Sequence, residues 1–254
     1  NWNFPIAFSK HDSSKLYTYS NHVHLSTDEG HSWETISPDL TRNDKSKLVS
    51  SGGPITQDNT GVEYYATIFA VDESPLQEGL IWVGSDDGLI HLTKDGGATW
   101  ENVTPKKMPD WMMINSIDAS SFDSGTAYIA GTRYKLGDFT PYLYVTDDYG
   151  KNWKLITNGI KDEHFTRVLR SDKVNKNILY AGTETGMYIS YDRGNSWNEF
   201  QKNLPIVPIT DLTIKDNSLI VATQGRSIWM IDDLTVFHQL TPSTDQIKLY
   251  KPKD

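Results

Sequence analysis

The chain has 254 residues, a formal net charge of -9 and no cysteine. A chain of this length buries roughly 70 to 75% of the surface that its unfolded form exposes, so it needs neither disulfides nor metals to fold. The negative charge argues against nucleic acid as a partner, and the lack of cysteine excludes disulfides, thiolate catalysis and cysteine metal sites.

Membrane and targeting segments are not expected. No apolar run approaches the roughly 20 residues of a membrane-spanning helix, so we expect no membrane span. Residues 1–8 have neither the basic start nor the apolar stretch of a signal peptide. We therefore expect the chain to be a mature or excised segment.

Short runs of β-branched and aromatic residues, separated by Gly, Asn, Asp and Ser, predict strands along the whole chain. They repeat in units of four. First strands are expected at 5–9, 67–72, 114–119, 165–170 and 209–215. Second strands follow at 16–19, 80–84, 127–131, 178–182 and 219–223. Third strands are expected at 23–25, 89–92, 142–145, 187–189 and 228–231.

Each of the first four units then carries one octet with the frame S/T-x-D-x-G-x-S/T-W, from which Asn152 is the single departure. An Asp two residues before a Gly can accept backbone N–H groups across a tight turn, the Gly can take a positive φ, and the Trp can bury its ring. We call these octets boxes, assign them a structural role, and expect a fourth strand to begin at each box Trp. The assigned residues are Asp28, Gly30, Trp33, Asp95, Gly97, Trp100, Asp148, Gly150, Trp153, Asp192, Gly194 and Trp197.

The predicted fold class is all-β, a β-propeller made of four-stranded antiparallel blades with five blades in this chain. The fifth blade lacks a box. Five blades could close a ring, but a chain that opens on an inner strand and adds a strand at the end favours part of a larger propeller. The expected blades cover about 1–50, 62–109, 110–160, 161–204 and 205–240, with the extra strand at about 245–252.

The boxes resemble the BNR repeat of sialidases, xyloglucanase-like glycosidases and sortilin-type receptors. Residues 1–5, 37–43, 51–56, 84–88 and 223–226 resemble a large group of bacterial sortilin-like proteins that are often labelled glycosyl hydrolases. This resemblance implies export, to the cell surface, the periplasm or the medium. It also implies structural rather than catalytic box carboxylates. Catalytic residues stay unknown, because residues 4–6 do not match the Arg-Ile-Pro motif of sialidases and no xyloglucanase Asp can be transferred.

The topology predicts which end of each blade carries function. The box joins strands three and four, so it shares an end with the turn between strands one and two. The turns between strands two and three, and the links between blades, lie at the opposite end. The long connections 37–65, 105–113 and 132–141 fall there and favour a binding surface. The candidate ligand-binding residues are Glu63, Asp86, Asp87, Trp111, Arg133, Tyr134, Glu184 and Arg226.

Structural explanations compete with the functional ones. Residues 86–88 fit a hairpin turn selected for its backbone, and Trp111 fits a ring that packs a loop. Glu184 and Arg226 could form an ion pair between blades. We expect His22 and His24 to point to opposite faces of their strand, which argues against a shared metal.

These features predict a binding propeller that recognises a peptide, protein or glycan, without a cofactor or metal. Its other partner could be the rest of its own propeller or a larger assembly. The alternative is a BNR-type glycoside hydrolase using paired carboxylates among Glu63, Asp86, Asp87 and Glu184, completed by N-terminal blades. A third possibility is a structural spacer.

Overall fold

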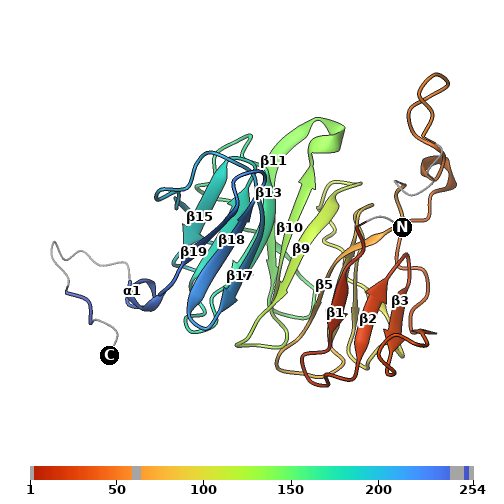
Figure 1. Ribbon diagram of the computed structural model, residues 1–254, viewed down its shortest axis with the longest axis horizontal. Helices are drawn as coiled ribbons and strands as arrows, with labels where there is room; N and C mark the ends of the chain where they lie inside the picture. Colours follow the sequence, from red (N-terminus) through yellow and green to blue (C-terminus); the bar gives the residue numbers. More distant parts are fainter. Residues whose placement is uncertain (1–2, 59–63, 241–248, 252–254) are drawn as a thin grey trace. The chain divides into compact units, whose positions relative to one another are not determined.

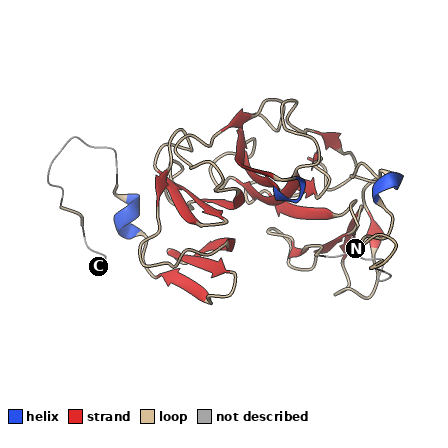
Figure 2. Ribbon diagram, turned by 90° about the horizontal axis from the view of Figure 1, so that it is seen from above, coloured by secondary structure: helices blue, strands red, loops and turns tan. Residues whose placement is uncertain are grey.

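The computed structural model describes residues 3–58, 64–240 and 249–251. Contacts along the chain divide it into two compact units, residues 1–127 with 146–153 and residues 128–145 with 154–254. Regular structure in both units is almost entirely strand (Figure 2). Among the described residues, no helix is long and apolar enough to cross a membrane.

The strands form five consecutive antiparallel sheets, which we call blades 1 to 5 (Figure 1). Blade 1 contains β1 (Ile6–Phe8), β2 (Leu16–Tyr19), β3 (Val23–Ser26) and β4 (Glu34–Thr35). Blade 2 contains β5 (Ile68–Glu73), β6 (Ile81–Ser85), β7 (Ile90–Thr93) and β8 (Glu101–Asn102). Blade 3 contains β9 (Met113–Ala119), β10 (Ala127–Arg133), β11 (Asp138–Thr146) and β12 (Lys154–Leu155). Blade 4 contains β13 (Thr166–Ser171), β14 (Leu179–Thr183), β15 (Gly186–Ser190) and β16 (Asn198–Glu199). Blade 5 contains β17 (Ile209–Lys215), β18 (Ser218–Thr223) and β19 (Ile228–Ile231).

The chain is therefore an all-β propeller of antiparallel blades, and the predicted fold class is confirmed. In blades 1 to 4 the short fourth strand begins one residue after the box Trp. This outer strand is the least regular part of each blade.

Blade 5 differs from the prediction, because the described residues give it three strands instead of four. After β19 the chain turns into α1 (Thr235–His238). No box follows β19, and the Asp233 carboxylate instead accepts hydrogen bonds from the Thr235 backbone N–H (2.9 Å) and hydroxyl (2.6 Å), an Asx turn just before the helix. Most of the predicted extra strand at 245–252 lies outside the described residues, and residues 249–251 are not in a strand.

The connection predicted at 132–141 is also different, since it is a hairpin rather than a long loop. β10 continues to Arg133, a 3₁₀ turn covers Tyr134–Leu136, and β11 begins at Asp138. Gly137 at φ 74° closes the turn, and the neighbouring aromatic and β-branched residues extend both strands. Of the other two connections, the described part of 37–65 contains a 3₁₀ turn at Lys45–Lys47.

All four boxes form the same hydrogen-bonded hairpin. The residue between Asp and Gly, and the Gly itself, both have positive φ, from 59° to 70° and from 79° to 103° respectively. Two successive positive φ angles are the signature of a tight hairpin turn whose twist matches that of the strands. In each box the first side chain donates to the Asp carboxylate and accepts from the Gly N–H, while the seventh residue donates to the Asp through its backbone and its side chain.

The departure at Asn152 preserves this chemistry. Its side-chain Nδ2 donates to Asp148 Oδ2 at 2.7 Å, where Ser32 Oγ donates to Asp28 Oδ2 at 2.6 Å. The same type of hydrogen bond, from Ser32 and from Thr99, lowers the pKa of Asp28 and Asp95 to about 2. Asn152 likewise lowers the pKa of Asp148. The box carboxylates are thus held in their charged form by the turn.

The box Trp of blades 2, 3 and 4 also donates a hydrogen bond to the preceding blade. Trp100 Nε1 donates to Ile36 O at 2.9 Å, Trp153 Nε1 to Val103 O at 2.7 Å, and Trp197 Nε1 to Ile156 O at 2.6 Å. The acceptor is always the third residue after the Trp of the preceding box. We call this contact the indole clamp.

The box Gly rests on the same acceptor residue. A Cβ at Gly150 would lie 2.6 Å from the Val103 Cβ, and one at Gly194 would lie 2.6 Å from the Ile156 Cδ1. A larger side chain at either position would have to displace this neighbour and would also be strained by the positive φ. Turn geometry and blade packing therefore both favour Gly.

We predict that Asp192→Ala destabilises the protein by about 1–3 kcal/mol, because it removes the acceptor for Ser190 Oγ, Ser196 N and Ser196 Oγ in one step. Urea unfolding followed by tryptophan fluorescence measures the change. Lys176→Ala, an exposed change in the same blade, should stay within about 0.5 kcal/mol of the unmodified chain. Equal stability of the Asp192 variant would contradict a structural role for the box.

Candidate functional site

The boxes and the turns between strands one and two share an end of their blades, as the topology predicts. The residue after the box Asp donates its N–H to that turn, from Gly96 to Gly79 O (3.0 Å), from Tyr149 to Gly125 O (2.9 Å) and from Arg193 to Asn177 O (2.9 Å). We call this the box end of a blade. The turns between strands two and three, and the links to the next blade, lie at the opposite end.

At the opposite end of blade 2, Asp86 and Asp87 are almost fully buried, with 3% and 1% of their surface exposed. Asp86 Oδ1 accepts from the Thr67 N–H at 2.9 Å. Asp87 accepts from Ser85 Oγ at 2.5 Å and from the Arg42 N–H at 2.8 Å, and burial raises its pKa. Both carboxylates thus accept hydrogen bonds from the backbone of other segments.

Trp111 lies in the same unit, within a cluster of aromatic and cationic groups. Its ring is 5.2 Å from the ring of Tyr65 in an edge-on arrangement, and the Arg42 guanidinium lies 5.3 Å above it. Arg42 also donates to the Asp87 carbonyl and to Asp110. Trp111 has φ 61°, an uncommon backbone angle for a bulky residue, so its surroundings hold it there. Trp111 and Asp87 therefore lie in one cluster, in which the Trp111 ring is packed against Tyr65 and Arg42.

The opposite end of blade 4 carries a second cluster, in the other unit. Tyr134 stacks on Phe165 with ring centroids 5.3 Å apart and planes 17° apart. The Arg167 guanidinium lies over both rings, at 5.7 Å from Tyr134 and 5.2 Å from Phe165. Glu184 Oε2 accepts from Arg167 Nε at 2.6 Å. We call Tyr134, Phe165, Arg167 and Glu184 the stacked cluster.

Glu184 thus pairs with Arg167 from the neighbouring strand, whereas the sequence had left open a pair with Arg226 or a ligand contact. Arg226 lies at the corresponding turn of blade 5, is exposed, and accepts a hydrogen bond from Trp229 Nε1 through its carbonyl oxygen. Sequence reasoning missed Arg167, which lies where the register between β13 and β14 shifts, so regular alternation does not place its side chain.

Arg133 belongs to the β10–β11 hairpin, where its Nη1 lies 2.6 Å from Asp138 Oδ2. Burial acts to raise the pKa of Asp138, but hydrogen bonds from Thr140, Tyr142 and Arg133 outweigh it and hold that pKa at about 2. The hairpin tip exposes Leu136 and Phe139, each close to half. Phe139 belongs to β11, although the connection 132–141 was predicted to be a loop.

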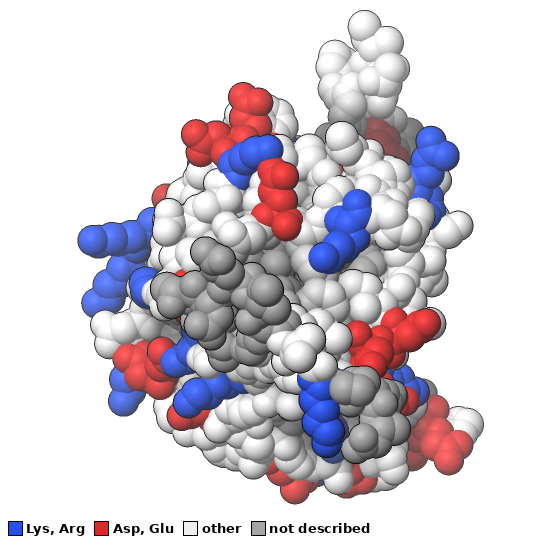
Figure 3. All heavy atoms as spheres, turned by 90° about the vertical axis from the view of Figure 1, so that its left-hand side faces the viewer, with Lys and Arg blue, Asp and Glu red and all other residues white. Residues whose placement is uncertain are grey.

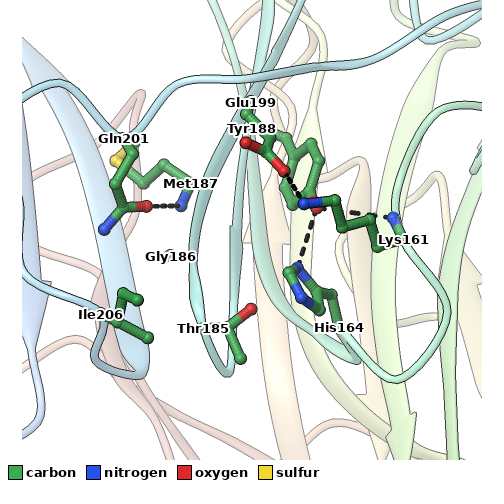
Figure 4. Close-up of a pocket in the computed structure, with 9 residues that line it drawn as sticks. All are labelled: Lys161, His164, Thr185, Gly186, Met187, Tyr188, Glu199, Gln201 and Ile206. Atoms are coloured by element: carbon green, nitrogen blue, oxygen red, sulfur yellow. Dashed lines mark hydrogen bonds and ion pairs between the residues drawn. The ribbon is translucent and has the colours of Figure 1, made fainter.

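A pocket of about 310 Å³ adjoins the stacked cluster, since His164 precedes Phe165 and Thr185 follows Glu184 (Figure 4). It is lined by residues of the link before β13, of the turn between β14 and β15, of β15 itself, of β16 and of the segment after β16. They are Lys161, His164, Thr185, Gly186, Met187, Tyr188, Glu199, Gln201 and Ile206. None of them was singled out from the sequence, although Glu184 is adjacent. The link that carries Lys161 and His164, residues 156–165, was not among the connections singled out from the sequence.

The polar groups of the pocket are positioned by one another. Figure 4 shows His164 and Tyr188 pointing toward each other, with 2.8 Å between the imidazole Nδ1 and the phenol oxygen. The Lys161 ammonium forms an ion pair with the Glu199 carboxylate, which raises the pKa of Lys161 and lowers that of Glu199. Burial raises the pKa of Tyr188. Both members of the ion pair are more than half exposed, so they remain accessible to a ligand.

Gln201 forms the opposite wall, where its Nε2 donates to the carbonyl oxygens of Leu204 (3.0 Å) and Pro205 (2.7 Å). Gly186, at φ 142°, leaves room for it, because a Cβ there would lie 1.9 Å from the Gln201 amide oxygen. Met187 and Ile206 supply the apolar part of the lining. The pocket therefore combines an apolar wall with a charged, hydrogen-bonding rim.

Two further predictions concern other parts of the chain. Glu63 lies outside the described residues. His22 and His24 do not point apart, since their ring centroids are 6.3 Å from each other, and side chains two positions apart along a strand share a face. Within residues 3–58, 64–240 and 249–251, no three His, Asp or Glu side chains come together as metal ligands.

The charged side chains do not form a field of one sign on the face drawn in Figure 3. Lys and Arg are interspersed with Asp and Glu across it.

The family model for the DUF6242 β-propeller domain matches residues 7–241. The chain belongs to this family. A search of curated proteins found no match. The family description names a fold without naming an activity.

Solved structures are similar in fold. The chain matches the GH74 xyloglucanase from Xanthomonas campestris with a TM-score of 0.66 and 16% identity, over 90% of this chain and 36% of that one. It matches an ancestral GH74 enzyme with a TM-score of 0.62 and 17% identity, over 86% of this chain and 27% of that one. It matches the β-propeller domain of Cps50 (Swd1) from Myceliophteria thermophila with a TM-score of 0.65 and 13% identity, over 96% of this chain and 70% of that one. The chain spans about a third of the length of these GH74 structures, and at such identities the likeness establishes the fold alone.

We predict that Arg167 and Glu184 couple energetically and that Arg226 and Glu184 do not. In a double-mutant cycle, Arg167→Met with Glu184→Gln should give a coupling of about 1 kcal/mol, because the pair is partly shielded and bonded through Nε. The same cycle with Arg226→Met is the control and should give a value near zero. Urea unfolding measures both, and the reverse ranking would contradict this site geometry.

Proposed function

We propose that the chain is a binding propeller whose main ligand site is the blade 4 surface formed by the pocket and the stacked cluster, and that its ligand is a peptide or a segment of a protein. The observation that carries the proposal is this juxtaposition of an open, mixed-polarity pocket with a preorganised aromatic and guanidinium platform. Aromatic rings and Arg are the groups that dominate protein interfaces.

The chemistry of the pocket suits a peptide. Met187 and Ile206 can cover an apolar side chain, and Ile206 is 80% exposed without a ligand. The Lys161–Glu199 pair offers a donor and an acceptor close together, which matches the alternating carbonyl and N–H groups of a main chain. The exposed Leu136 and Phe139 of the β10–β11 hairpin add apolar surface in the same unit.

A glycan is less well supported than a peptide. Sugar rings stack on free aromatic faces, whereas the rings of Tyr134 and Phe165 face one another and Arg167 lies over both. Phe165 is only 5% exposed.

Glycoside hydrolysis also has less support. The candidate carboxylates Asp86 and Asp87 are buried and accept structural hydrogen bonds, and Glu184 is bound to Arg167. A general acid or nucleophile must instead present its oxygens to the scissile bond.

The resemblance to exported sortilin-like propellers supports a secreted, cell-surface or periplasmic binding module.

The proposal is tested with a phage-displayed library of random peptides panned against the purified chain. Selected peptides should bind Ile206→Asp at least about tenfold more weakly, because the new carboxylate disrupts the apolar wall. Val174→Asp is the matched control, since Val174 is also an exposed aliphatic residue of blade 4 but lies in the turn at the box end. Isothermal titration calorimetry gives the affinities. Equal losses in the two variants, or binding on a glycan array with no selected peptide, would contradict the proposal.

We expect no hydrolysis when the chain is incubated with a panel of plant and bacterial polysaccharides and reducing ends are counted. The variant Glu184→Gln serves as the control. Hydrolysis by the unmodified chain that this variant abolishes would favour the enzyme alternative.

A further inference from the structure

A groove of about 810 Å³ lies between the outermost strand of blade 1 and the box of blade 2. One wall is residues 34–38, which contain β4, and the other is residues 95–100, the box from its Asp to its Trp. Leu25, Ile36 and Trp100 are partly buried against the core of these two blades and form an apolar floor. All of these residues belong to the unit of residues 1–127 with 146–153. We call this surface the rim groove.

The corresponding walls of blades 3 and 4 are joined by hydrogen bonds. Lys154 Nζ donates to Asn195 Oδ1 at 2.6 Å, and Asn158 Nδ2 donates to the Asn195 carbonyl oxygen at 3.1 Å. The Asn158 carbonyl oxygen accepts from the Trp197 backbone N–H at 2.9 Å. A Cβ at Gly159 would lie 2.4 Å from the Trp197 carbonyl oxygen. The main chain at Asn158 and Gly159 therefore lies against the box and closes the space between the walls.

Different residues at the equivalent positions leave the rim groove open. Counted from the box Trp, Glu34 and Ala98 take the positions of the bridging Lys and Asn of blades 3 and 4, and Pro38 takes that of the other Asn. An ionised carboxylate, a methyl group and a proline ring carry no hydrogen-bond donor, so they cannot form the same bridge. After Pro38 the chain follows the β2–β3 turn of its own blade, where the Leu40 N–H donates to the Asn21 carbonyl oxygen at 3.0 Å. The position that main chain fills beside the box of blade 4 is thus vacant beside the box of blade 2.

The charged side chains that line the rim groove are acidic on both walls. Glu34 lies on one wall and Asp95 on the other, and both are exposed. Hydrogen bonds from the Thr99 hydroxyl and backbone N–H lower the pKa of Asp95 to about 2, so this carboxylate stays charged. The preceding basic side chain, Lys94, lies 4.6 Å over the ring of Tyr149 instead. The charge of the groove therefore favours a cationic occupant over an anionic one.

We propose that the rim groove binds a basic segment of a partner protein. The main chain of this segment lies against the box as residues 158–159 do in blade 4, with a carbonyl oxygen that accepts from the Trp100 N–H. A Lys or Arg side chain of the segment reaches the Glu34 carboxylate, and an aliphatic side chain covers the floor at Ile36. This site is separate from the blade 4 pocket and goes beyond the proposed function.

The test uses the full chain and two end-blocked, fluorescein-labelled heptapeptides, one alternating Lys with Val and the other alternating Glu with Val. Fluorescence anisotropy at physiological ionic strength should show at least about tenfold tighter binding of the Lys peptide. In ¹⁵N NMR spectra the Lys peptide should shift the amide signals of residues 95–100.

Three variants locate the binding. The double variant Glu34→Lys with Ala98→Asn installs the bridge of blades 3 and 4 and should weaken binding of the Lys peptide at least about tenfold. Glu34→Gln should weaken it about three- to fivefold, the range of an exposed ion pair. Glu101→Gln is the matched control, because Glu101 is exposed at the same register position of blade 2 and does not line the groove. It should leave the affinity unchanged.

Several results would overturn the proposal. They are no binding of the Lys peptide, equal or tighter binding of the Glu peptide, and undiminished binding by a double variant that urea unfolding shows to be folded. Loss of Lys-peptide binding in Ile206→Asp would also overturn it, because the peptide would then occupy the blade 4 pocket. If the double variant does not fold, Glu34→Gln and Glu101→Gln decide, and equal effects of the two contradict the proposal.

Discussion

The indole clamp is the contact on which the blade-to-blade organisation depends. A sheet of four short strands cannot bury both of its faces alone, so each blade has to be held against a neighbour. The box meets this need with one octet. Its Asp fixes the turn, its Gly allows close approach, and its Trp both fills the interface and bonds to the carbonyl of the preceding blade. Local turn chemistry and long-range packing are therefore carried by the same eight residues.

This arrangement concentrates rigidity at one end of each blade and leaves the opposite end free to vary. The boxes repeat nearly identical geometry, whereas the opposite ends differ: buried carboxylates in blade 2, a projecting hairpin in blade 3, and a stacked cluster with a pocket in blade 4. A rigid scaffold with variable connections is the usual basis of a binding surface.

The sequence predicted the repeated features, the strands and the boxes, better than the features that occur in one blade alone. Strand positions and the shared end of boxes and turns followed from a motif copied four times. The fourth strand expected in blade 5 is missing from the described residues, where β19 is followed instead by the short helix α1. The partner of Glu184 was left open between Arg226 and a ligand, and it is Arg167, which lies where the register of β13 shifts. The pocket was missed because Lys161, His164 and Glu199 are ordinary surface residues until packing brings them together.

The most direct test of the clamp is the exchange rate of the four box indole N–H groups, followed by NMR with ¹⁵N-labelled tryptophan and assigned by single Trp→Phe variants. The account predicts slow exchange for Trp100, Trp153 and Trp197, slowest at the buried Trp197, and fast exchange for Trp33. Equal exchange rates at all four would contradict the claim that these indoles hold one blade to the next.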